Sequence, residues 1–299
     1  MSQTAELRSG IYPPLPTFFT SNDELDLRTL RQHIRRIAGS GIAGYVVMGS
    51  NGEAVHLSSE ERAQVIETTR VEAGEQALVL AGCGEQSTRS SIALCRQAAQ
   101  AGANFALILP PFYYKGRMDS AALLAHYRAI ADNSPLPVVI YNMPASAAGL
   151  DLDAATICAL AEHPNIIGVK DSAGNMAKLS QIAASTPARF GVFAGSAGYL
   201  LPALAIGAVG AVAALANIFP NEVCRLQELF ESGQMAEARV LQARLAPSNT
   251  AVTNTYSVPG LKAALNILFD YGGSPRSPLQ ALTAQERDRL AAILRHITN

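Results

Sequence analysis

Short, continuously apolar segments of four to six residues recur along most of the chain and alternate with longer amphipathic segments. Because their apolar residues are continuous rather than alternating, these segments are predicted to be strands buried on both faces, as in a parallel sheet. The predicted strands cover residues 10–15, 44–47, 77–81, 105–109, 137–141, 166–170, 190–194 and 210–213.

Helices are predicted between these strands. One covers residues 27–37, whose apolar side chains share a face. Another begins after Ser58, because Ser58 and Glu61 have the spacing of a capping box. Two more cover residues 121–130 and 152–160. Strand and helix units repeat at intervals of roughly 20 to 35 residues, which predicts an α/β fold with a closed TIM (β/α)8 barrel.

The barrel is expected to end near Ser232, giving a catalytic barrel of residues 1–232 and a C-terminal helical domain of residues 233–299 packed on it. The second part has helical patterns over residues 235–245 and 260–268, and a last helix capped by Thr283 and Glu286. No repeat or low-complexity linker separates the two parts.

Two other architectures can be weighed against the barrel. Gly39, Gly41 and Gly44 form a GxGxxG pattern, but they follow a helix and precede a strand, which is the reverse of a dinucleotide-binding turn. Residues 190–221 carry no charge, which raises the question of a membrane span. Glycines and Pro202 interrupt this segment at short intervals, so it is predicted to form two buried strands around a short helix.

The charge composition excludes several classes of partner. The chain has 23 basic and 24 acidic residues, and only 16% of its residues are charged, so no nucleic-acid or membrane partner is expected. The cysteines and histidines are scattered without metal-ligand spacing, so no metal site is expected and the thiols are predicted to be reduced and mostly structural. Residues 1–10 lack the apolar core of a leader, which predicts a cytoplasmic protein.

Functional side chains of such barrels lie at the C-terminal ends of the strands and in the loops that follow. These positions contain no carboxylate pair and no catalytic histidine or cysteine. The residues at the ends of the second, fourth, fifth, sixth and seventh strands, or directly after them, are Gly49–Glu53, Pro110–Lys115, Tyr141–Pro144, Gly168–Ser172 and Ala194–Ser196.

Lys170 ends the sixth predicted strand and is one of only four lysines in the chain. Burial disfavours the charged form of an amine, and a neutral amine is a nucleophile toward ketones and aldehydes, so Lys170 suits Schiff-base chemistry. An ion pair with Asp171 is the structural alternative. Lys178 and Lys262 are predicted to be solvated surface charges, whereas Lys115 lies on the functional rim and could contact an anionic group.

A Schiff-base lysine needs a proton shuttle, and Tyr141 ends the neighbouring strand. Its alternative role is that of a core aromatic whose hydroxyl group finds a backbone partner. Ser50 and Asn51 lie in a glycine-flanked loop whose backbone N–H groups could bind a carboxylate. The alternative is that this loop is an ordinary tight turn that binds no ligand.

Together these residues resemble the dihydrodipicolinate synthase and N-acetylneuraminate lyase superfamily of lysine-dependent pyruvate aldolases. The motifs that carry the resemblance occur in the family's order; they are Gly49-Ser50-Asn51-Gly52-Glu53, the Pro-Phe-Tyr-Tyr loop that ends at Tyr114, Tyr141-Asn142-x-Pro144 and Gly168-x-Lys170-Asp171. Within this family the chain is most similar to the 4-hydroxy-2-oxoglutarate aldolases, and this likeness spans the whole chain.

The resemblance implies that Lys170 forms a covalent imine with a 2-oxo acid, without any other cofactor, and that Tyr141 is the general acid and base. Ser50 would relay protons between Tyr141 and Tyr113, which in the family reaches across a dimer interface. Anchoring the alignment on Pro-Phe-Tyr favours Tyr113 over Tyr114 for this role. The remaining residues implied to bind substrate are Ser50, Asn51, Ser172, Gly195, Ser196 and Val212. A homotetramer built from two dimers is also implied.

The departures from the family pattern bear on the substrate. Dihydrodipicolinate synthases place an arginine shortly after the Tyr-Asn-x-Pro motif to bind the second substrate, whereas residues 145–149 here contain none. Ser196 stands where sialic-acid lyases have an acidic residue. The resemblance therefore implies cleavage of 4-hydroxy-2-oxoglutarate, or a similar 4-hydroxy-2-oxo acid, to pyruvate and an aldehyde such as glyoxylate. The alternatives are 4-hydroxy-tetrahydrodipicolinate synthesis, cleavage of a 2-keto-3-deoxy sugar acid, and a 2-oxo-acid-binding protein without turnover.

Overall fold

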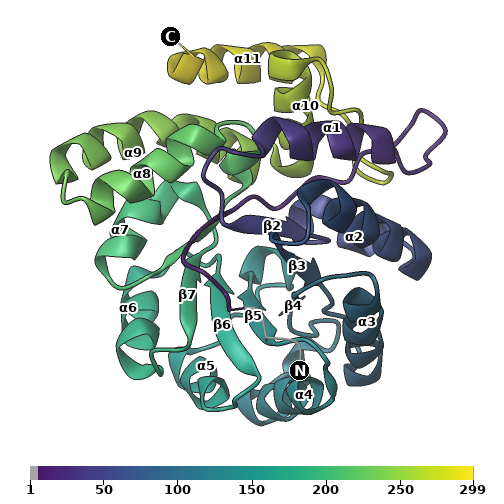
Figure 1. The fold of residues 1–299 in the computed structure, drawn as a ribbon, viewed down its shortest axis with the longest axis vertical. Coiled ribbons are helices and arrows are strands. Elements are labelled where there is room, and N and C mark those ends of the chain that lie inside the picture. Colours follow the sequence, from purple (N-terminus) through teal and green to yellow (C-terminus); the bar gives the residue numbers. More distant parts are fainter. Residues whose placement is uncertain (1–5, 299) are drawn as a thin grey trace.

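A computed structural model describes residues 6–298 of the chain, and this part forms one eight-stranded parallel sheet. The hydrogen-bonded order is β1-β8-β7-β6-β5-β4-β3-β2, and a parallel bridge between Pro14 and Val46 joins the two ends into a barrel (Figure 1). The strands are β1 (Gly10–Tyr12), β2 (Gly44–Val47), β3 (Leu78–Gly82), β4 (Phe105–Ile108), β5 (Val138–Asn142), β6 (Ile166–Asp171), β7 (Gly191–Ala194) and β8 (Gly210–Val212).

Helices follow the strands and form the outer layer, as Figure 1 shows. They are α1 (Leu27–Ile37), α2 (Ser59–Ala73), α3 (Thr88–Gln100), α4 (Ser120–Asn133), α5 (Ala154–Ala161), α6 (Met176–Ser185), α7 (Leu200–Ala205) and α8 (Pro220–Glu231). Short 3-10 turns lie in the loops: η1 (Ser50–Gly52), η2 (Ala54–His56), η3 (Lys115–Arg117), η4 (Pro144–Ser146), η5 (Ala197–Tyr199) and η6 (Ala214–Asn217).

The local signals in the sequence explain where these helices begin and which face they bury. α1 starts after Asp26, whose carboxylate accepts a hydrogen bond from Thr29 N at 2.9 Å, and it buries Leu30, Ile34 and Ile37. The capping box that begins α2 is present as predicted, with both of its reciprocal hydrogen bonds.

The buried apolar residues form two clusters that correspond to the two sides of the barrel wall. One cluster fills the barrel interior and includes Tyr12, Phe105, Val139, Phe193 and Val212. The larger cluster lies between the strands and the helices. Both faces of each strand are therefore buried, as the continuous apolar runs predicted.

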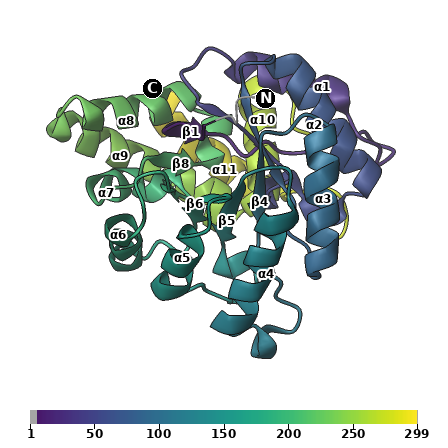
Figure 2. The ribbon, with the colours of Figure 1, turned by 60° about the horizontal axis from the view of Figure 1, so that its bottom comes forward.

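The C-terminal part consists of α9 (Met235–Thr250), the π-helical turn η7 (Ala251–Thr255), α10 (Ser257–Phe269) and α11 (Ala284–Thr298). The last helix has the predicted hydrogen bonds between Thr283 and Glu286. α9 contacts α8 and η5, and α10 contacts η1, so these helices pack on the barrel (Figure 2). His33 of α1 links the C-terminal part to the barrel. One of its ring nitrogens lies 2.8 Å from Tyr271 Oη, which follows α10, and the other lies 3.0 Å from Asn217 Oδ1 in η6.

The observed architecture confirms the predicted TIM barrel with a C-terminal helical extension. β1 ends three residues earlier than predicted, at Tyr12, because Pro13 and Pro14 have no N–H group to donate to a strand ladder. The other strand ends agree to within one residue. The uncharged segment of residues 190–221 contains the two buried strands β7 and β8 with the short helix α7 between them, as predicted. The division into domains at residue 232 stays a prediction.

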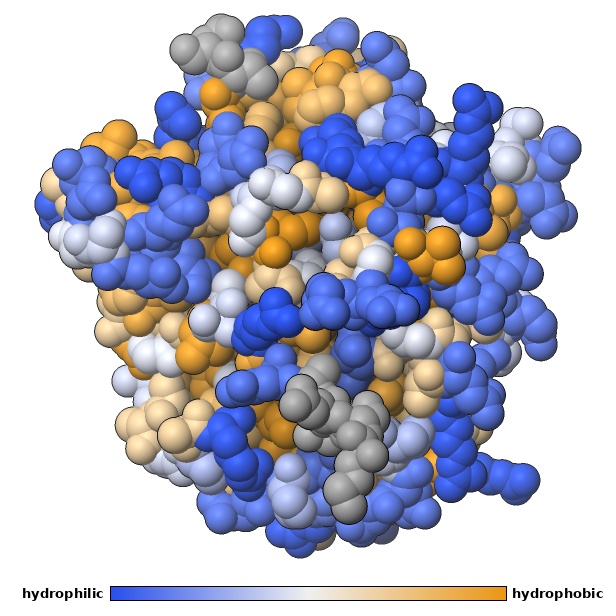
Figure 3. Space-filling model, viewed as in Figure 1, coloured by the Kyte–Doolittle hydropathy of each residue, from blue (hydrophilic) through white to orange (hydrophobic). Residues whose placement is uncertain are grey.

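Within residues 6–298, no helix is long and apolar enough to cross a membrane. On the face shown in Figure 3, hydrophilic side chains cover most of the surface and hydrophobic ones lie between them in small groups. Half of the polar segment of residues 1–10, on which the predicted location depends, lies outside the described residues.

Candidate active site

Lys170 and Tyr141 lie side by side at the C-terminal ends of two adjacent strands. They are partners in the register between β5 and β6. The Lys170 Nζ atom lies 3.9 Å from the centroid of the Tyr141 ring, over its face. Only 3% of the Lys170 surface and 5% of the Tyr141 surface are exposed. A shared register between parallel strands therefore brings the predicted nucleophile and the predicted proton shuttle together.

Lys170 has no carboxylate partner in the described part of the chain. Side chains alternate along a strand, so Asp171 points to the opposite side of the barrel wall from Lys170. There the Asp171 carboxylate forms an ion pair with Lys178, whose Nζ atom lies 2.9 Å from Asp171 Oδ2. The alternative of an ion pair between Lys170 and Asp171 is therefore wrong.

Lys178 is buried, and its prediction as a solvated charge is wrong. It lies on α6, on the face that meets the end of β6, and 9% of its surface is exposed. Its ammonium group also lies 2.5 Å from Asp151 Oδ1. Asn142 donates hydrogen bonds to the same two carboxylates, at 2.7 Å each. This network fixes the ends of β5 and β6 and thereby the backbone that carries Tyr141 and Lys170.

A chain of hydroxyl groups leads away from Tyr141. Its Oη atom lies 3.1 Å from Ser50 Oγ, which in turn donates to Ser146 Oγ at 3.3 Å. Ser50 begins the 3-10 turn η1, which follows β2, and the first N–H groups of such a turn have no intrahelical acceptor. Within residues 6–298 the Tyr141 hydroxyl group is paired with this serine side chain and not with the backbone, as its alternative role would require.

Eight of the nine predicted site residues line one cavity of about 480 Å³ above the strand ends. They are Ser50, Asn51, Tyr141, Lys170, Ser172, Gly195, Ser196 and Val212. Glycine is required at position 195, since a Cβ atom there would lie 1.9 Å from Ser172 Oγ. The Ser172 hydroxyl group is buried and has no hydrogen-bond partner within residues 6–298, so it remains available to a ligand.

Tyr113 is the predicted site residue that does not line this cavity. It follows β4 in a loop held by Gln86, whose Oε1 atom accepts from the backbone N–H of Phe112 and Tyr113 at 2.9 Å each. The Tyr113 side chain is 76% exposed, and its neighbour Tyr114 is 71% exposed. Lys115 is also exposed and does not line the cavity.

Lys262 is fully buried, which contradicts its prediction as a surface charge. Its Nζ atom lies 2.5 Å from Glu53 Oε1, and neither side chain is exposed. Burial lowers the pKa of Lys262, and the Glu53 carboxylate opposes this shift. Glu53 follows directly after the turn that carries Ser50, so α10 holds the base of the predicted carboxylate-binding loop.

Several residues that line the cavity were not among the predicted site residues. Met143 and Ser146 follow β5, and Asn249, Thr253 and Asn254 come from the C-terminal helices. Ser146 lies in a predicted rim loop and could have been identified there. Asn249 has no sequence signal, since it reaches the site only when α9 folds back onto η5.

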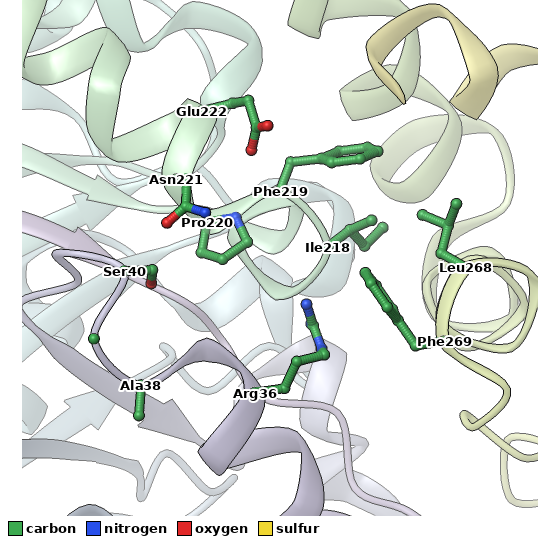
Figure 4. Close-up of a pocket in the computed structure, with 11 residues that line it drawn as sticks. Arg36, Ala38, Ser40, Ile218, Phe219, Pro220, Asn221, Glu222, Leu268 and Phe269 are labelled. Carbon is green, nitrogen blue, oxygen red and sulfur yellow. The ribbon is translucent and has the colours of Figure 1, made fainter. Parts of the chain in front are cut away.

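Two other cavities within residues 6–298 do not include Lys170 in their lining. One of them, a second cavity of about 390 Å³, shares Ser50 and Tyr141 with the Lys170 cavity and is also lined by Arg62 and Glu85. The one in Figure 4, of about 540 Å³, shares no residue with the Lys170 cavity. Its cation, Arg36, stacks 3.9 Å from the centroid of the Phe269 ring. Among residues 6–298 no group of histidines, cysteines or carboxylates has the arrangement of a metal site.

The fold is a (β/α)8 barrel whose polar side chains gather in a cavity at the C-terminal ends of its strands. This is where the active sites of barrel enzymes lie. A family model described as the dihydrodipicolinate synthetase family matches residues 7–297, and the chain belongs to this family. The family predicted from the motifs is thus confirmed, and its members include aldolases.

Individual relatives narrow the comparison. A protein of Emericella nidulans named probable 4-hydroxy-2-oxoglutarate aldolase, mitochondrial, is 44% identical over 93% of this chain and 91% of its own length. An L-threo-3-deoxy-hexylosonate aldolase of Hypocrea jecorina is 40% identical over 96% of this chain and 94% of its own. The crystal structure of a dihydrodipicolinate synthase from Bacillus anthracis matches with a TM-score of 0.93 at 28% identity, covering 97% of this chain and 99% of that one.

Proposed function

We propose that this chain is a lysine-dependent aldolase that cleaves 4-hydroxy-2-oxo acids, 4-hydroxy-2-oxoglutarate among them, to pyruvate and an aldehyde. The observation that carries the proposal is the Lys170 amine, which is buried, has no carboxylate partner within residues 6–298, and lies 3.9 Å from the centroid of the Tyr141 ring in an open cavity. Such an amine is a nucleophile for a ketone.

In the proposed mechanism, Lys170 Nζ adds to the C2 carbonyl of the substrate. The resulting carbinolamine loses its hydroxyl group as water, with a proton supplied by Tyr141, and a protonated imine remains. The Tyr141 phenolate then takes the proton of the 4-hydroxyl group. The C3–C4 bond breaks, its electron pair forms an enamine, and the aldehyde leaves. Tyr141 returns the proton to C3, and hydrolysis of the imine releases pyruvate and the free amine.

The proposed binding roles follow the positions of the other residues around Lys170. Ser50 and Asn51 would hold the C1 carboxylate with their side chains and the N–H groups of η1. Ser172, Gly195, Ser196 and Val212 would line the rest of the substrate. No further cofactor is proposed, because the imine itself accepts the electron pair.

The proposed assembly is a homotetramer in which Tyr113 completes the proton relay of a neighbouring subunit. Its support is the exposure of large side chains near the second cavity, namely Val55 at 80%, Tyr113 at 76% and Tyr114 at 71%. The proposed location is the cytoplasm. Because the Emericella nidulans relative is named as mitochondrial, cell fractionation with an antibody to this chain is the direct test.

Reductive trapping tests the covalent mechanism. Borohydride added together with pyruvate is expected to leave a reduced three-carbon adduct on the peptide that contains Lys170, detected by mass spectrometry. Borohydride without pyruvate is the control. A folded enzyme that releases pyruvate from a 4-hydroxy-2-oxo acid but leaves Lys170 unmodified would exclude the imine. Pyruvate binding without turnover of any 2-oxo acid would instead support a binding protein.

Replacement of Tyr141 by phenylalanine tests the proton shuttle. We expect Tyr141→Phe to lower kcat by about 10²- to 10⁴-fold, because the ring that packs on Lys170 is kept and the acid and base group is lost. A steady-state assay of pyruvate release measures this. The buried Tyr45 lies outside the cavity, so Tyr45→Phe serves as the control and should keep full activity. Activity of Tyr141→Phe close to that of the unmodified enzyme would assign the proton transfer elsewhere.

A further inference from the structure

Lys178 joins the strand that carries the nucleophile to the loop that follows the strand of Tyr141. Its ammonium group lies 2.9 Å from Asp171 Oδ2 at the end of β6 and 2.5 Å from Asp151 Oδ1, which lies between η4 and α5. It also donates to the carbonyl oxygen of Leu152 at 3.3 Å. The Lys178 side chain is only 8% exposed, so salt screens these contacts little.

Asp171 is the residue directly after the nucleophile, and each of its three acceptor atoms is used. Its Oδ1 atom accepts from the Ala173 N–H group at 3.0 Å. Its Oδ2 atom accepts from Lys178 and from Asn142. Its carbonyl oxygen accepts from Tyr199 Oη at 2.8 Å. The backbone directly after the nucleophile is therefore held in one orientation.

The same contacts close the loop of residues 143–151 at both ends. Asn142, directly before the loop, donates to Asp151 Oδ1 at 2.7 Å. The Asn142 Oδ1 atom accepts from the N–H group of Leu152, directly after the loop, at 3.0 Å. Lys178 holds the same end of the loop through the Asp151 carboxylate and the Leu152 carbonyl oxygen. The first and last residues of the loop are therefore bound to one another.

The backbone inside this loop is strained. Ala148 has a φ of 50°, a left-handed conformation that is unfavourable for a residue with a Cβ atom, and Gly149 follows with a φ of 76°. Strained backbone persists only where the surrounding structure holds it. Asp151 comes two residues after Gly149, so its ion pair with Lys178 is placed to hold this conformation.

The loop places Ser146 at the end of the hydroxyl chain. Ser146 lies in η4, and Ser50 Oγ donates to its hydroxyl oxygen at 3.3 Å. A hydroxyl group has one proton to donate, so while Ser50 donates to Ser146 it accepts from Tyr141. The position of Ser146 therefore decides in which direction the hydroxyl group of Tyr141 points.

We propose that Lys178 and Asp151 are positioning residues for the proton transfer. By holding the loop they keep Ser146 on the hydroxyl chain, and by holding the end of β6 they keep the nucleophile beside the Tyr141 ring. Neither of them lines the Lys170 cavity, so both act through other residues. This inference rests on the proposed aldolase function and adds two residues to the machinery of the same site.

Asp151→Ala is the main test, because the Asp151 side chain is 44% exposed and its removal leaves Lys178 paired with Asp171. We expect kcat for pyruvate release from a 4-hydroxy-2-oxo acid to fall by about 10- to 100-fold, since a misplacement of about 1 Å can cost about 10²-fold. KM should change by less than about threefold. Asp132→Ala is the matched control, because it removes a 65% exposed carboxylate that pairs with His163. It should leave kcat and KM unchanged.

The conservative variant Asp151→Asn separates position from mere stability. Its amide oxygen can accept from Lys178 and Asn142 as the carboxylate does, so the loop stays tied. Asp151→Asn is therefore expected to keep at least about half of kcat, whereas Asp151→Ala loses most of it. A loss in Asp151→Asn as large as that in Asp151→Ala would contradict the positioning role.

Replacement of the cation tests whether Lys178 and Asp151 act as one unit. Lys178→Met should lower kcat at least as far as Asp151→Ala does. The double variant should be no slower than Lys178→Met alone to within about twofold, because both changes break the same contact. Losses that multiply would contradict the inference. Circular dichroism shows whether Lys178→Met is folded, and if it is not, the two Asp151 variants decide.

Amide hydrogen exchange gives a readout that does not depend on turnover. In Asp151→Ala the peptide that covers residues 143–152 should exchange faster by at least about tenfold, whereas peptides of α4 should be unchanged. An unchanged loop and an unchanged kcat would overturn the inference and leave the aldolase function intact. Absence of pyruvate release by the unmodified protein, with no borohydride adduct on Lys170, would instead overturn the proposed function and the inference with it.

Discussion

Replacement of Lys170 by methionine is expected to lower the rate of pyruvate formation by about 10⁴-fold or more. No other amine lines the cavity within the described residues, so nothing can form the imine in its place. The free energy of unfolding should hardly change, because no carboxylate among residues 6–298 pairs with Lys170 and would be left unpaired by its loss. Methionine has a similar length and can pack on the Tyr141 ring.

The measurements are a pyruvate-release assay and urea denaturation of Lys170→Met and of the unmodified protein. Arg225→Met is the control for loss of a cation, since Arg225 is half exposed and remote from the cavity. It should leave both activity and stability nearly unchanged. If Lys170→Met keeps a tenth of the activity, Lys170 is not the nucleophile. If it unfolds instead, Lys170 is a structural residue.

The strand pattern explains why the fold and the centre of the site could be predicted. Continuous apolar runs specify strands buried on both faces, and in a parallel barrel their C-terminal ends gather on one side. Lys170 and Tyr141 each end such a run, so their approach follows from topology alone. Ser50 follows β2 on the same side, and its position next to Tyr141 follows from the same rule.

The wrong or missing predictions concern residues whose environment depends on distant parts of the chain. Lys262 contacts a carboxylate 209 positions away in the sequence, and no helical pattern around Lys262 announces this partner. Lys178 meets Asp171 only because α6 packs back on β6. Asn249 enters the cavity because α9 lies on η5, a contact between elements that are far apart along the chain. Periodicity defines a helix face but not the residue that this face meets.

Loss of the Lys262 charge is expected to have the largest effect on stability. Lys262→Met should reduce the free energy of unfolding by about 3–5 kcal/mol, because it leaves the fully buried Glu53 carboxylate without its cation. Glu53 Oε2 keeps the hydrogen bond from the Arg276 backbone N–H at 2.9 Å and its contact with His56 Nδ1 at 3.1 Å, but neither group replaces the ammonium group of the lysine. A fall in Tm of roughly 6–15 °C should accompany this loss.

The double variant Lys262→Met with Glu53→Gln separates the cost of an unpaired charge from the loss of packing. It should be more stable than Lys262→Met by about 1–3 kcal/mol, because the buried carboxylate has been removed as well. Arg225→Met, which breaks a half-exposed pair with Glu228, should change the free energy of unfolding by less than about 0.5 kcal/mol. A double variant less stable than Lys262→Met would show that Glu53 is not destabilised by losing Lys262. In that case the ion pair between Lys262 and Glu53 would serve to hold the turn that carries Ser50. Its loss would then be measured as a rise in the KM for the 2-oxo acid.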